Sequence, residues 1–303
     1  MTYRKLGRSG PRVSAVALGC MTLGTDRARA DRILRRALDL GVTLFDTADL
    51  YDHGVNEEIV GQALRGARDR VLIATKVGNR WRPDGSGWDW DPRGAWILQE
   101  VHESLRRLAV DYIDLYQLHG GTLDDPVDET VAAFERLREQ GLIREWGISS
   151  IRPNVVRRFA ALAAEGKASL TSEMVQYSVL DRRPEEEILG TARVAGFGVL
   201  VRGAVASGLL AGKPAAEYLG LAASEVEAAQ DALSRAAGPD GDSSQAAIRF
   251  VLSHPAVTSV VAGASSVAQV EANAAAADAP PLSAEEQAAL RESVRALRYT
   301  SHR

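Results

Sequence analysis

The stretch Leu44-Phe45-Asp46-Thr47-Ala48-Asp49-Leu50-Tyr51 passes from apolar to polar within three residues. With Val42 and Thr43 before it, its first half has the length and side-chain type of a short buried strand. The strand ends on the carboxyl group of Asp46, and the phenol of Tyr51 follows five residues later. Taken singly, Asp46 also fits a cap of the next segment. The two groups together predict a functional site at the C-terminal end of this strand.

The same pattern, a short apolar run followed by an amphipathic segment, recurs along the chain. It predicts eight strands, at 15–18, 42–45, 71–75, 112–118, 143–148, 172–177, 197–201 and 258–261. It also predicts eight helices, at 26–41, 55–66, 92–108, 126–140, 152–165, 184–195, 242–253 and 267–277, with Asp26 and Ser243 as N-terminal caps. This alternation is typical of an α/β fold, a (β/α)₈ TIM barrel, whereas an open doubly wound sheet is the competing arrangement.

Several segments are additional to the eight repeats. Residues 3–14 are expected to form an N-terminal hairpin, residues 77–91 a long loop, and residues 222–236 and 283–298 extra helices. No linker composition interrupts the repeats. We therefore expect residues 1–303 to form a single barrel domain.

Composition excludes several classes of partner. The 303 residues are 46% hydrophobic and 25% charged, with a net charge of −4 and no basic block, so nucleic acid and anionic membrane are not expected as partners. A single cysteine, Cys20, excludes a disulfide within the chain and a cysteine metal cluster, and no metal site is expected. There is no apolar signal segment and no run of about 18 apolar residues, which predicts a cytoplasmic protein. The oligomeric state is not predicted.

Four titratable residues follow adjacent strands and together suit proton transfer. Lys76 ends the third strand and His119 the fourth, next to Asp46 and Tyr51 from the second. A tyrosine has a free pKa of about 10, and a neighbouring ammonium is expected to lower it. Such a set can protonate an oxygen that gains negative charge, as in carbonyl reduction, or deprotonate an alcohol in reverse. Singly, Lys76 also fits a solvated loop lysine and His119 a turn residue.

The motifs at these strand ends resemble those of the aldo-keto reductases, in particular bacterial members with a long Trp-containing loop after strand 3. The resemblance extends over residues 3–298 in the expected order. It rests on Phe45–Tyr51, Ile73-Ala74-Thr75-Lys76, Asp111–His119, Gly147-Ile148-Ser149-Ser150, Gln176-Tyr177-Ser178, Gly208–Lys213 and Gly263-Ala264-Ser265-Ser266.

The resemblance implies reduction of an aldehyde or ketone by direct hydride transfer without a metal, with NADP(H) preferred over NAD(H). Tyr51 would be the general acid, tuned by Asp46 and Lys76, and His119 would orient the carbonyl. The residues implied to bind the cofactor are Ser149 and Gln176 at the carboxamide, Arg202 stacking on the nicotinamide, Gly203, Ser207 and Gly208 at the pyrophosphate, and Gly263, Ser265, Gln269 and Asn273 at the adenosine end.

Two departures from the family pattern stand out. Ser265, Ser266 and Gln269 occur where relatives often carry Lys or Arg for the 2′-phosphate, and Ala272 replaces a common adenine-binding Glu. The substrate pocket is expected to include Met21 and the three loop tryptophans, Trp81, Trp88 and Trp90, although packing of that loop against the barrel would also explain them. The substrate, a small carbonyl or alcohol compound, is not identified further.

Two other functions fit the strand-end residues. A lysine at the end of a barrel strand also suits a lyase or aldolase that forms a Schiff base on Lys76. A cofactor-binding regulatory module with little turnover would carry the same motifs.

Overall fold

A closed barrel of eight parallel strands forms the centre of the protein, in a computed structural model that describes residues 1–239 and 241–303. The strands follow one another around the barrel in chain order, and the last pairs with the first, β12 with β3. Their bounds are Val16–Gly19 (β3), Leu44–Asp46 (β4), Leu72–Val77 (β5), Ile113–Leu118 (β8), Ile143–Ser149 (β9), Ser172–Gln176 (β10), Gly198–Arg202 (β11) and Val257–Gly263 (β12). The (β/α)₈ barrel is confirmed, and the open sheet is ruled out.

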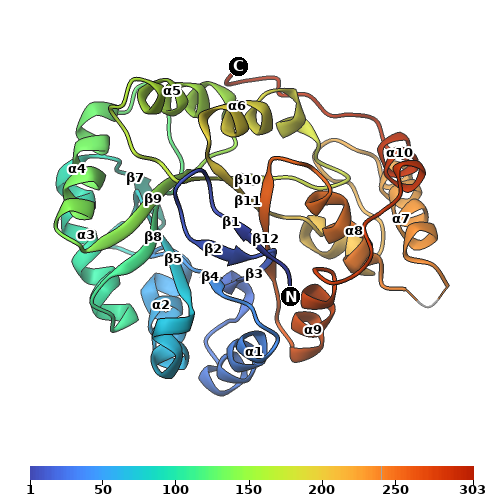
Figure 1. Ribbon diagram of the computed structural model, residues 1–303, viewed down its shortest axis with the longest axis horizontal. Helices are drawn as coiled ribbons and strands as arrows, with labels where there is room; N and C mark the ends of the chain where they lie inside the picture. The colour runs from blue at the N-terminus through green and yellow to red at the C-terminus, as the bar shows by residue number, and fades with distance from the viewer. Residues whose placement is uncertain (240) are drawn as a thin grey trace.

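Helices surround the barrel, as Figure 1 shows. They are Arg27–Asp39 (α1), Val55–Leu64 (α2), Gly94–Leu108 (α3), Val127–Glu139 (α4), Pro153–Ala164 (α5), Ile188–Ala195 (α6), Ala223–Ala237 (α7), Ser243–Leu252 (α8), Val267–Ala275 (α9) and Ala284–Glu292 (α10). Of these, α7 and α10 are the two predicted extra helices, and they lie beside each other on the outside of the ring.

Four sequence predictions need correction. The helix predicted over 184–195 begins only at Ile188, because residues 183–186 form a separate 3₁₀ turn, and the last helix ends at Glu292 instead of residue 298. The cap of α8 is Asp242, whose carboxylate accepts the N–H of Ser244, so Ser243 is the first helical residue. The segment 77–91 is not a plain loop. It contains an antiparallel hairpin of Asn79–Trp81 (β6) and Trp88–Trp90 (β7).

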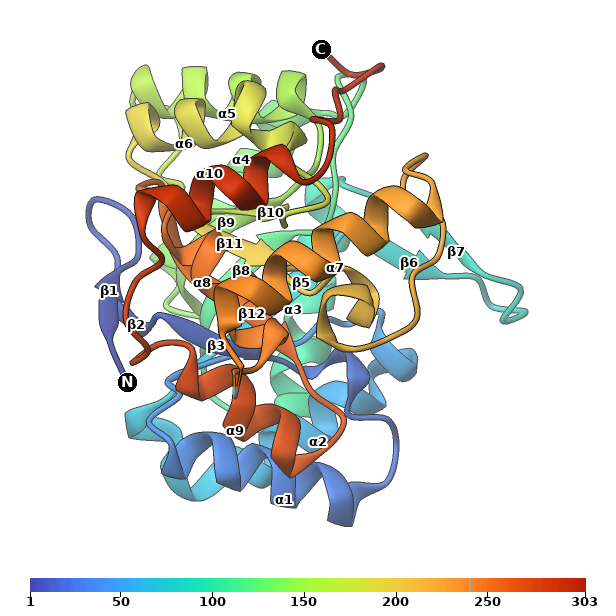
Figure 2. The same ribbon diagram turned by 90° about the vertical axis from the view of Figure 1, so that its right-hand side faces the viewer.

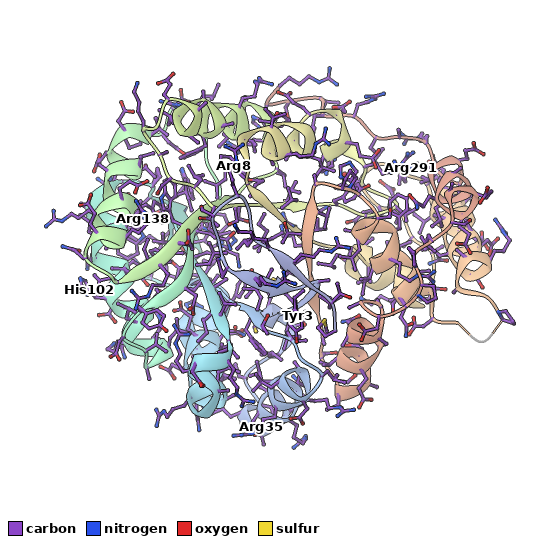
Figure 3. The ribbon with its side chains drawn as sticks, in the orientation of Figure 1. Tyr3, Arg8, Arg35, His102, Arg138 and Arg291 are labelled. Atoms are coloured by element: carbon purple, nitrogen blue, oxygen red, sulfur yellow. The ribbon has the colours of Figure 1, made fainter. Side chains whose placement is uncertain are left out.

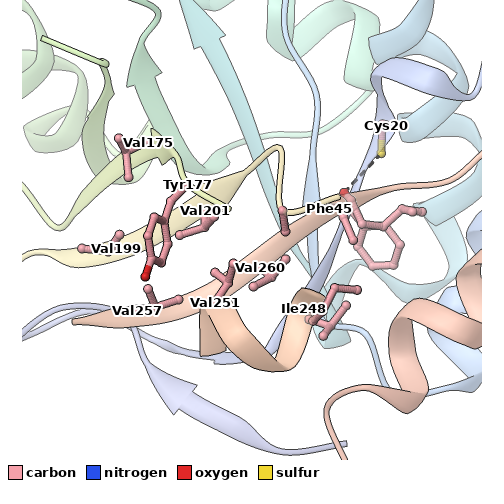
Figure 4. Close-up of a cluster of buried hydrophobic side chains, with 14 of the residues drawn as sticks. Cys20, Phe45, Val175, Tyr177, Val199, Val201, Ile248, Val251, Val257 and Val260 are labelled. Atoms are coloured by element: carbon pink, nitrogen blue, oxygen red, sulfur yellow. Dashed lines mark hydrogen bonds between the residues drawn. The ribbon is translucent and has the colours of Figure 1, made fainter. Parts of the chain in front are cut away.

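The main apolar core lies between the outside of the barrel and the helices. Figure 4 shows one part of it, where valines from β11 and β12 meet Ile248 and Val251 of α8. Long charged side chains occupy the outer faces of the helices, as Figure 3 shows for Arg35 and Arg138. Both form ion pairs within their own helices, with Asp31 and Glu135 respectively.

At the end of the barrel that the N-terminal hairpin covers, the interior is filled by apolar side chains. This hairpin pairs Tyr3–Lys5 (β1) with Arg12–Ser14 (β2), as predicted. Its Leu6 and Val13 pack against inward-facing apolar residues of the strands, including Leu44, Leu115 and Met174. Figure 2 shows β1–β2 and β6–β7 at opposite ends of the barrel. The polar strand ends therefore lie away from the closed end.

Candidate active site

Lys76 is the centre of the predicted catalytic group. Its Nζ lies 2.7 Å from Oδ2 of Asp46, 2.7 Å from the carbonyl oxygen of Thr47 and 3.5 Å from the hydroxyl of Tyr51. An ammonium has three N–H donors, so these three acceptors match its capacity. Lys76 is 1% exposed and Asp46 4% exposed. Asp46 and Lys76 lie side by side because β4 and β5 are neighbouring parallel strands that end at the same edge of the barrel.

His119 completes the group from the next strand, β8. Its backbone N–H donates to the carbonyl of Val77 at 2.7 Å, and its ring stands edge-on to that of Tyr51, with 6.2 Å between ring centroids. Burial, with the positive charges of Lys76 and Arg202, lowers the pKa of His119 to about 3. The imidazole is therefore neutral at pH 7. It can offer an N–H to a substrate oxygen without releasing a proton.

The electrostatics of Tyr51 differ from the sequence prediction. Lys76 does lower the pKa of the phenol, as expected, but burial has the larger effect and Asp46 adds to it, so the pKa is raised overall. For Lys76, burial is again the largest single influence and lowers its pKa, but Asp46 and Tyr51 together outweigh it and raise the pKa. The site thus holds a neutral phenol beside a charged ammonium. That combination suits donation of a proton to a developing oxyanion.

The residues predicted at the nicotinamide end lie on neighbouring strands. Gln176 pairs in register with Arg202, and Ser149 ends β9, the strand on the other side of β10. The guanidinium of Arg202 donates to Oε1 of Gln176 at 2.7 Å, and Nε2 of Gln176 donates to Asp181 at 3.0 Å and to the hydroxyl of Tyr218 at 3.2 Å. The sequence did not predict Asp181 or Tyr218: Tyr218 is 42 residues from Gln176, and Asp181, five residues after Gln176, lies outside the motifs that predicted the site.

The predicted pyrophosphate segment has an unusual backbone. Gly203, Ser207 and Gly208 all have positive φ, at 73°, 57° and 93°. The ammonium of Lys213 donates to the carbonyl oxygen of Ser207 at 2.7 Å. A positive charge therefore lies at this segment. Lys213 ends the Gly208–Lys213 motif, but the sequence did not predict that it lies at the cofactor site.

The predicted adenosine end lies where β12 leads into α9. Oε1 of Gln269 accepts the backbone N–H of Ser265 at 2.8 Å, and Nδ2 of Asn273 donates to the carbonyl of Gly263 at 3.1 Å. Ser266 is the N-terminal cap of α9. A helix N-terminus favours a phosphate group, and polar side chains surround it here. This helix N-terminus and the ammonium of Lys213 are thus two groups that suit a phosphate.

The four residues predicted for the substrate pocket have different environments. Met21 is 61% exposed in the 3₁₀ turn after β3, and Trp88 is 48% exposed on β7. Trp81 stacks on His53, with 3.7 Å between ring centroids. The indole N–H of Trp90 donates to Asp125 at 2.9 Å. Part of the hairpin thus packs on the barrel, and part is open to solvent.

A buried charged cluster behind the site was not predicted. Glu57 accepts the hydroxyl of Thr75 at 2.6 Å and Nε of Arg107 at 2.6 Å, and Arg107 also donates to Glu100. Asp49 is buried near them, and neither of its carboxyl oxygens has a hydrogen-bond partner among residues 1–239 and 241–303. Burial and the charges of Glu57 and Glu100 raise its pKa well above the usual range. In sequence Glu57, Glu100 and Arg107 fit ordinary helix surface positions, and nothing in the Phe45–Tyr51 motif indicated that the carboxyl of Asp49 is buried.

The part of the chain that the structure describes contains neither a cluster of metal ligands nor a helix able to cross a membrane. There, no three or more His, Cys, Asp or Glu side chains are grouped so as to hold a metal ion. No helix in the same residues has the length and apolar content to cross a membrane.

Both the sequence and the structure are similar to those of known proteins. The model of the aldo/keto reductase family matches residues 15–295. The uncharacterized oxidoreductase YqkF of Bacillus subtilis is 46% identical over a 314-residue alignment that covers all of both chains. The holo form of the aldo-keto reductase AKR11C1 from Bacillus halodurans is 46% identical, with a TM-score of 0.93 over 100% of this chain and 99% of that one. Its apo form is 44% identical, with a TM-score of 0.84 over the same shares.

Proposed function

The chain belongs to the aldo/keto reductase family, and from this premise we propose that it reduces an aldehyde or ketone to an alcohol with NADPH, with Tyr51 as the proton donor. The observation that carries the proposal is the position of Lys76 Nζ, between Asp46 Oδ2 at 2.7 Å and the Tyr51 hydroxyl at 3.5 Å. The neutral ring of His119 stands edge-on to the same phenol.

Each side chain has a separate task in this reaction. When bound, a reduced nicotinamide would supply the hydride. The Tyr51 O–H donates its proton to the carbonyl oxygen, and Lys76 stabilises the phenolate that remains. Asp46 keeps that lysine charged and in place, and its own charge also helps to keep the Tyr51 phenol protonated. The His119 ring donates a hydrogen bond to the substrate oxygen and orients it. In alcohol oxidation the proton moves in the opposite direction.

The cofactor is proposed to lie across the ends of β9 to β12. Ser149 and Gln176 would bind the carboxamide, and the planar guanidinium of Arg202 would stack on the nicotinamide. Gly203 and Ser207 would offer backbone N–H groups to the pyrophosphate, Gly208 would let the backbone approach it closely, and Lys213 would neutralise it. Gly263, Ser265, Gln269 and Asn273 would line the adenosine end. The holo form of a 46% identical relative supports cofactor binding.

The preference for NADP(H) is tested by fluorescence titration with NADPH and NADH. We expect NADPH to bind more tightly, because the N-terminus of α9, capped by Ser266, favours the additional phosphate of NADPH at the adenosine end. Equal dissociation constants for the two nucleotides would overturn this preference and leave the catalytic assignment intact.

The catalytic assignment is tested with Tyr51→Phe on a panel of aldehydes and ketones. We expect kcat to fall by about 10²–10⁴-fold, as for loss of a general acid, with an unchanged dissociation constant for NADPH. Full NADPH-dependent turnover by this variant would show that the proton donor is another group. Tight NADPH binding by the wild-type protein with negligible turnover on every carbonyl would favour the regulatory module.

The environment of Lys76 argues against a Schiff-base lyase or aldolase. A nucleophilic lysine must be neutral, which requires a lowered pKa, whereas Asp46 and Tyr51 raise the pKa of Lys76 despite its burial. Borohydride trapping of a carbonyl substrate on Lys76, unaffected by NADPH, would support this alternative.

A further inference from the structure

The β6–β7 hairpin contacts the chain immediately after three of the four proposed catalytic residues. Trp81 of β6 stacks on His53, two residues after Tyr51. Trp90 of β7 lies against Gly78, two residues after Lys76, and against Gly120, which directly follows His119. The segments that leave β4, β5 and β8 therefore meet at one small hairpin.

The backbone after Tyr51 needs external support. Asp52, His53 and Gly54 are three consecutive residues with positive φ, at 49°, 55° and 85°. For the two that are not glycine this conformation is strained, and such strain persists only where surrounding packing maintains it. The Trp81 ring supplies that packing on His53, with an angle of 24° between the ring planes. The position of Tyr51 thus depends on a contact made from another strand.

The Trp90 ring packs closely against two glycines, Gly78 and Gly120. A Cβ atom at Gly78 would lie 2.6 Å from the Trp90 ring, and one at Gly120 would lie 3.1 Å from it. The ring therefore fills the space that these two glycines leave open. Asn79 of the same hairpin donates to the carbonyl oxygen of His119 at 3.3 Å. The indole N–H of Trp90 donates to Asp125, which fixes the ring in this place.

We propose that the β6–β7 hairpin is a positioning element of the catalytic site, in which Trp81 fixes Tyr51 through His53 and Trp90 fixes the segment that carries His119. This inference rests on the proposed function, in which Tyr51 donates the proton. It differs from a role of these tryptophans in lining the substrate pocket. A positioning element affects the rate for every substrate, whereas a pocket wall affects large substrates most.

A double-mutant cycle on the stacked pair tests the inference. His53→Asn removes the ring but keeps a residue that tolerates positive φ, and Trp81→Leu removes the indole but keeps apolar bulk. Trp81→Phe retains a flat ring and should restore much of the rate. Arg82→Ala is the matched control, because Arg82 lies in the turn of the same hairpin and its guanidinium pairs with exposed Asp89, away from His53. Each variant is assayed with NADPH on propanal and on 4-nitrobenzaldehyde.

We expect both single variants to lower kcat by about tenfold on both aldehydes, since loss of one ring stack or a small displacement of a catalytic group has effects of this order. The double variant should be no slower than either single variant, and the dissociation constant for NADPH and the Arg82→Ala rate should be unchanged. A loss confined to KM that grows with aldehyde size would overturn the inference, as would rate losses that multiply in the double variant.

Tyr51→Phe, assayed in parallel, separates this inference from the proposed function. If Tyr51→Phe keeps the wild-type rate, the part of the proposed function that makes Tyr51 the proton donor is wrong, and the positioning of Tyr51 has no catalytic meaning. If Tyr51→Phe is inactive but His53→Asn and Trp81→Leu keep the wild-type kcat, only the positioning role of the hairpin is wrong.

Discussion

The buried ion pair between Lys76 and Asp46 gives a stability prediction that does not depend on substrate. The two charges are 2.7 Å apart, and their side chains are 1% and 6% exposed. At an effective dielectric constant of about 20, Coulomb's law gives about 6 kcal/mol of attraction at this distance. Burial of the two ions costs several kcal/mol each, so the pair as a whole is close to neutral in stability. A variant that lacks one partner still has the cost of burying the other charge, but it has lost the attraction between the two charges.

Lys76→Met should therefore lower the free energy of unfolding by about 3–5 kcal/mol at pH 7. The double variant Asp46→Asn/Lys76→Met, which removes both charges, should lie within about 1 kcal/mol of the wild type. In the single variant the Asp46 carboxyl keeps its burial and loses its cation, so we expect its pKa to rise further. The folded state then holds a proton that the unfolded state releases, and the deficit should grow as the pH rises from 4 to 8.

Urea unfolding followed by circular dichroism measures these differences. The reasoning is refuted if Lys76→Met costs less than about 1 kcal/mol, or if the double variant loses as much stability as Lys76→Met alone. A deficit that shrinks with rising pH would contradict the electrostatic explanation, because the uncompensated carboxylate is charged at high pH.

Three further predictions concern other buried positions. Because the pKa of Asp49 is raised in the folded state, its contribution to stability falls as the pH rises above about 4, so Asp49→Asn should gain stability relative to the wild type between pH 5 and pH 8 in urea unfolding. Gly61→Ala should destabilise the protein by about 1–3 kcal/mol, because the new Cβ would lie 2.0 Å from the carbonyl oxygen of Leu108, whereas Gly66→Ala, where no atom of the described residues lies within 4 Å, should be nearly neutral in a thermal melt. Burial raises the pKa of the Cys20 thiol, so iodoacetamide at pH 8 should label Cys20 only after unfolding, and labelling of the folded protein at the unfolded rate would contradict its burial.

The barrel strands were predictable because their signal is local. Val42–Phe45 and most of its seven counterparts are short runs in which apolar residues predominate, as expected because parallel strands in a barrel are buried on both faces. Adjacency of strands that follow one another in sequence then placed Asp46, Lys76 and His119 together. The hairpin in residues 77–91 was missed because its strands are only three residues long, and the six residues between them, 82–87, carry the proline, aspartate and glycines of a loop.

The features that were missed depend on contacts between distant residues. The stack of His53 on Trp81 joins positions 28 residues apart, and Arg107 reaches Glu57 across 50 residues. No periodicity in sequence reports such pairs. The pKa of Tyr51 was also misjudged for this reason, because the presence of Lys76 can be read from a motif, whereas the burial that outweighs it cannot.

The closed end of the barrel has a practical consequence for how the protein can be altered. Leu6 and Val13 of the N-terminal hairpin fill the bottom of the barrel, and the terminal ammonium of Met1 pairs with Asp278 at 2.7 Å. In barrels of this type stability is concentrated at the bottom and chemistry at the top. Residues at one end can therefore be changed with little effect on the role of the other end. A purification tag belongs at the C-terminal residues 301–303, which are exposed. Libraries aimed at new substrates can vary the loops that follow the C-terminal ends of the barrel strands and leave the N-terminal hairpin unchanged.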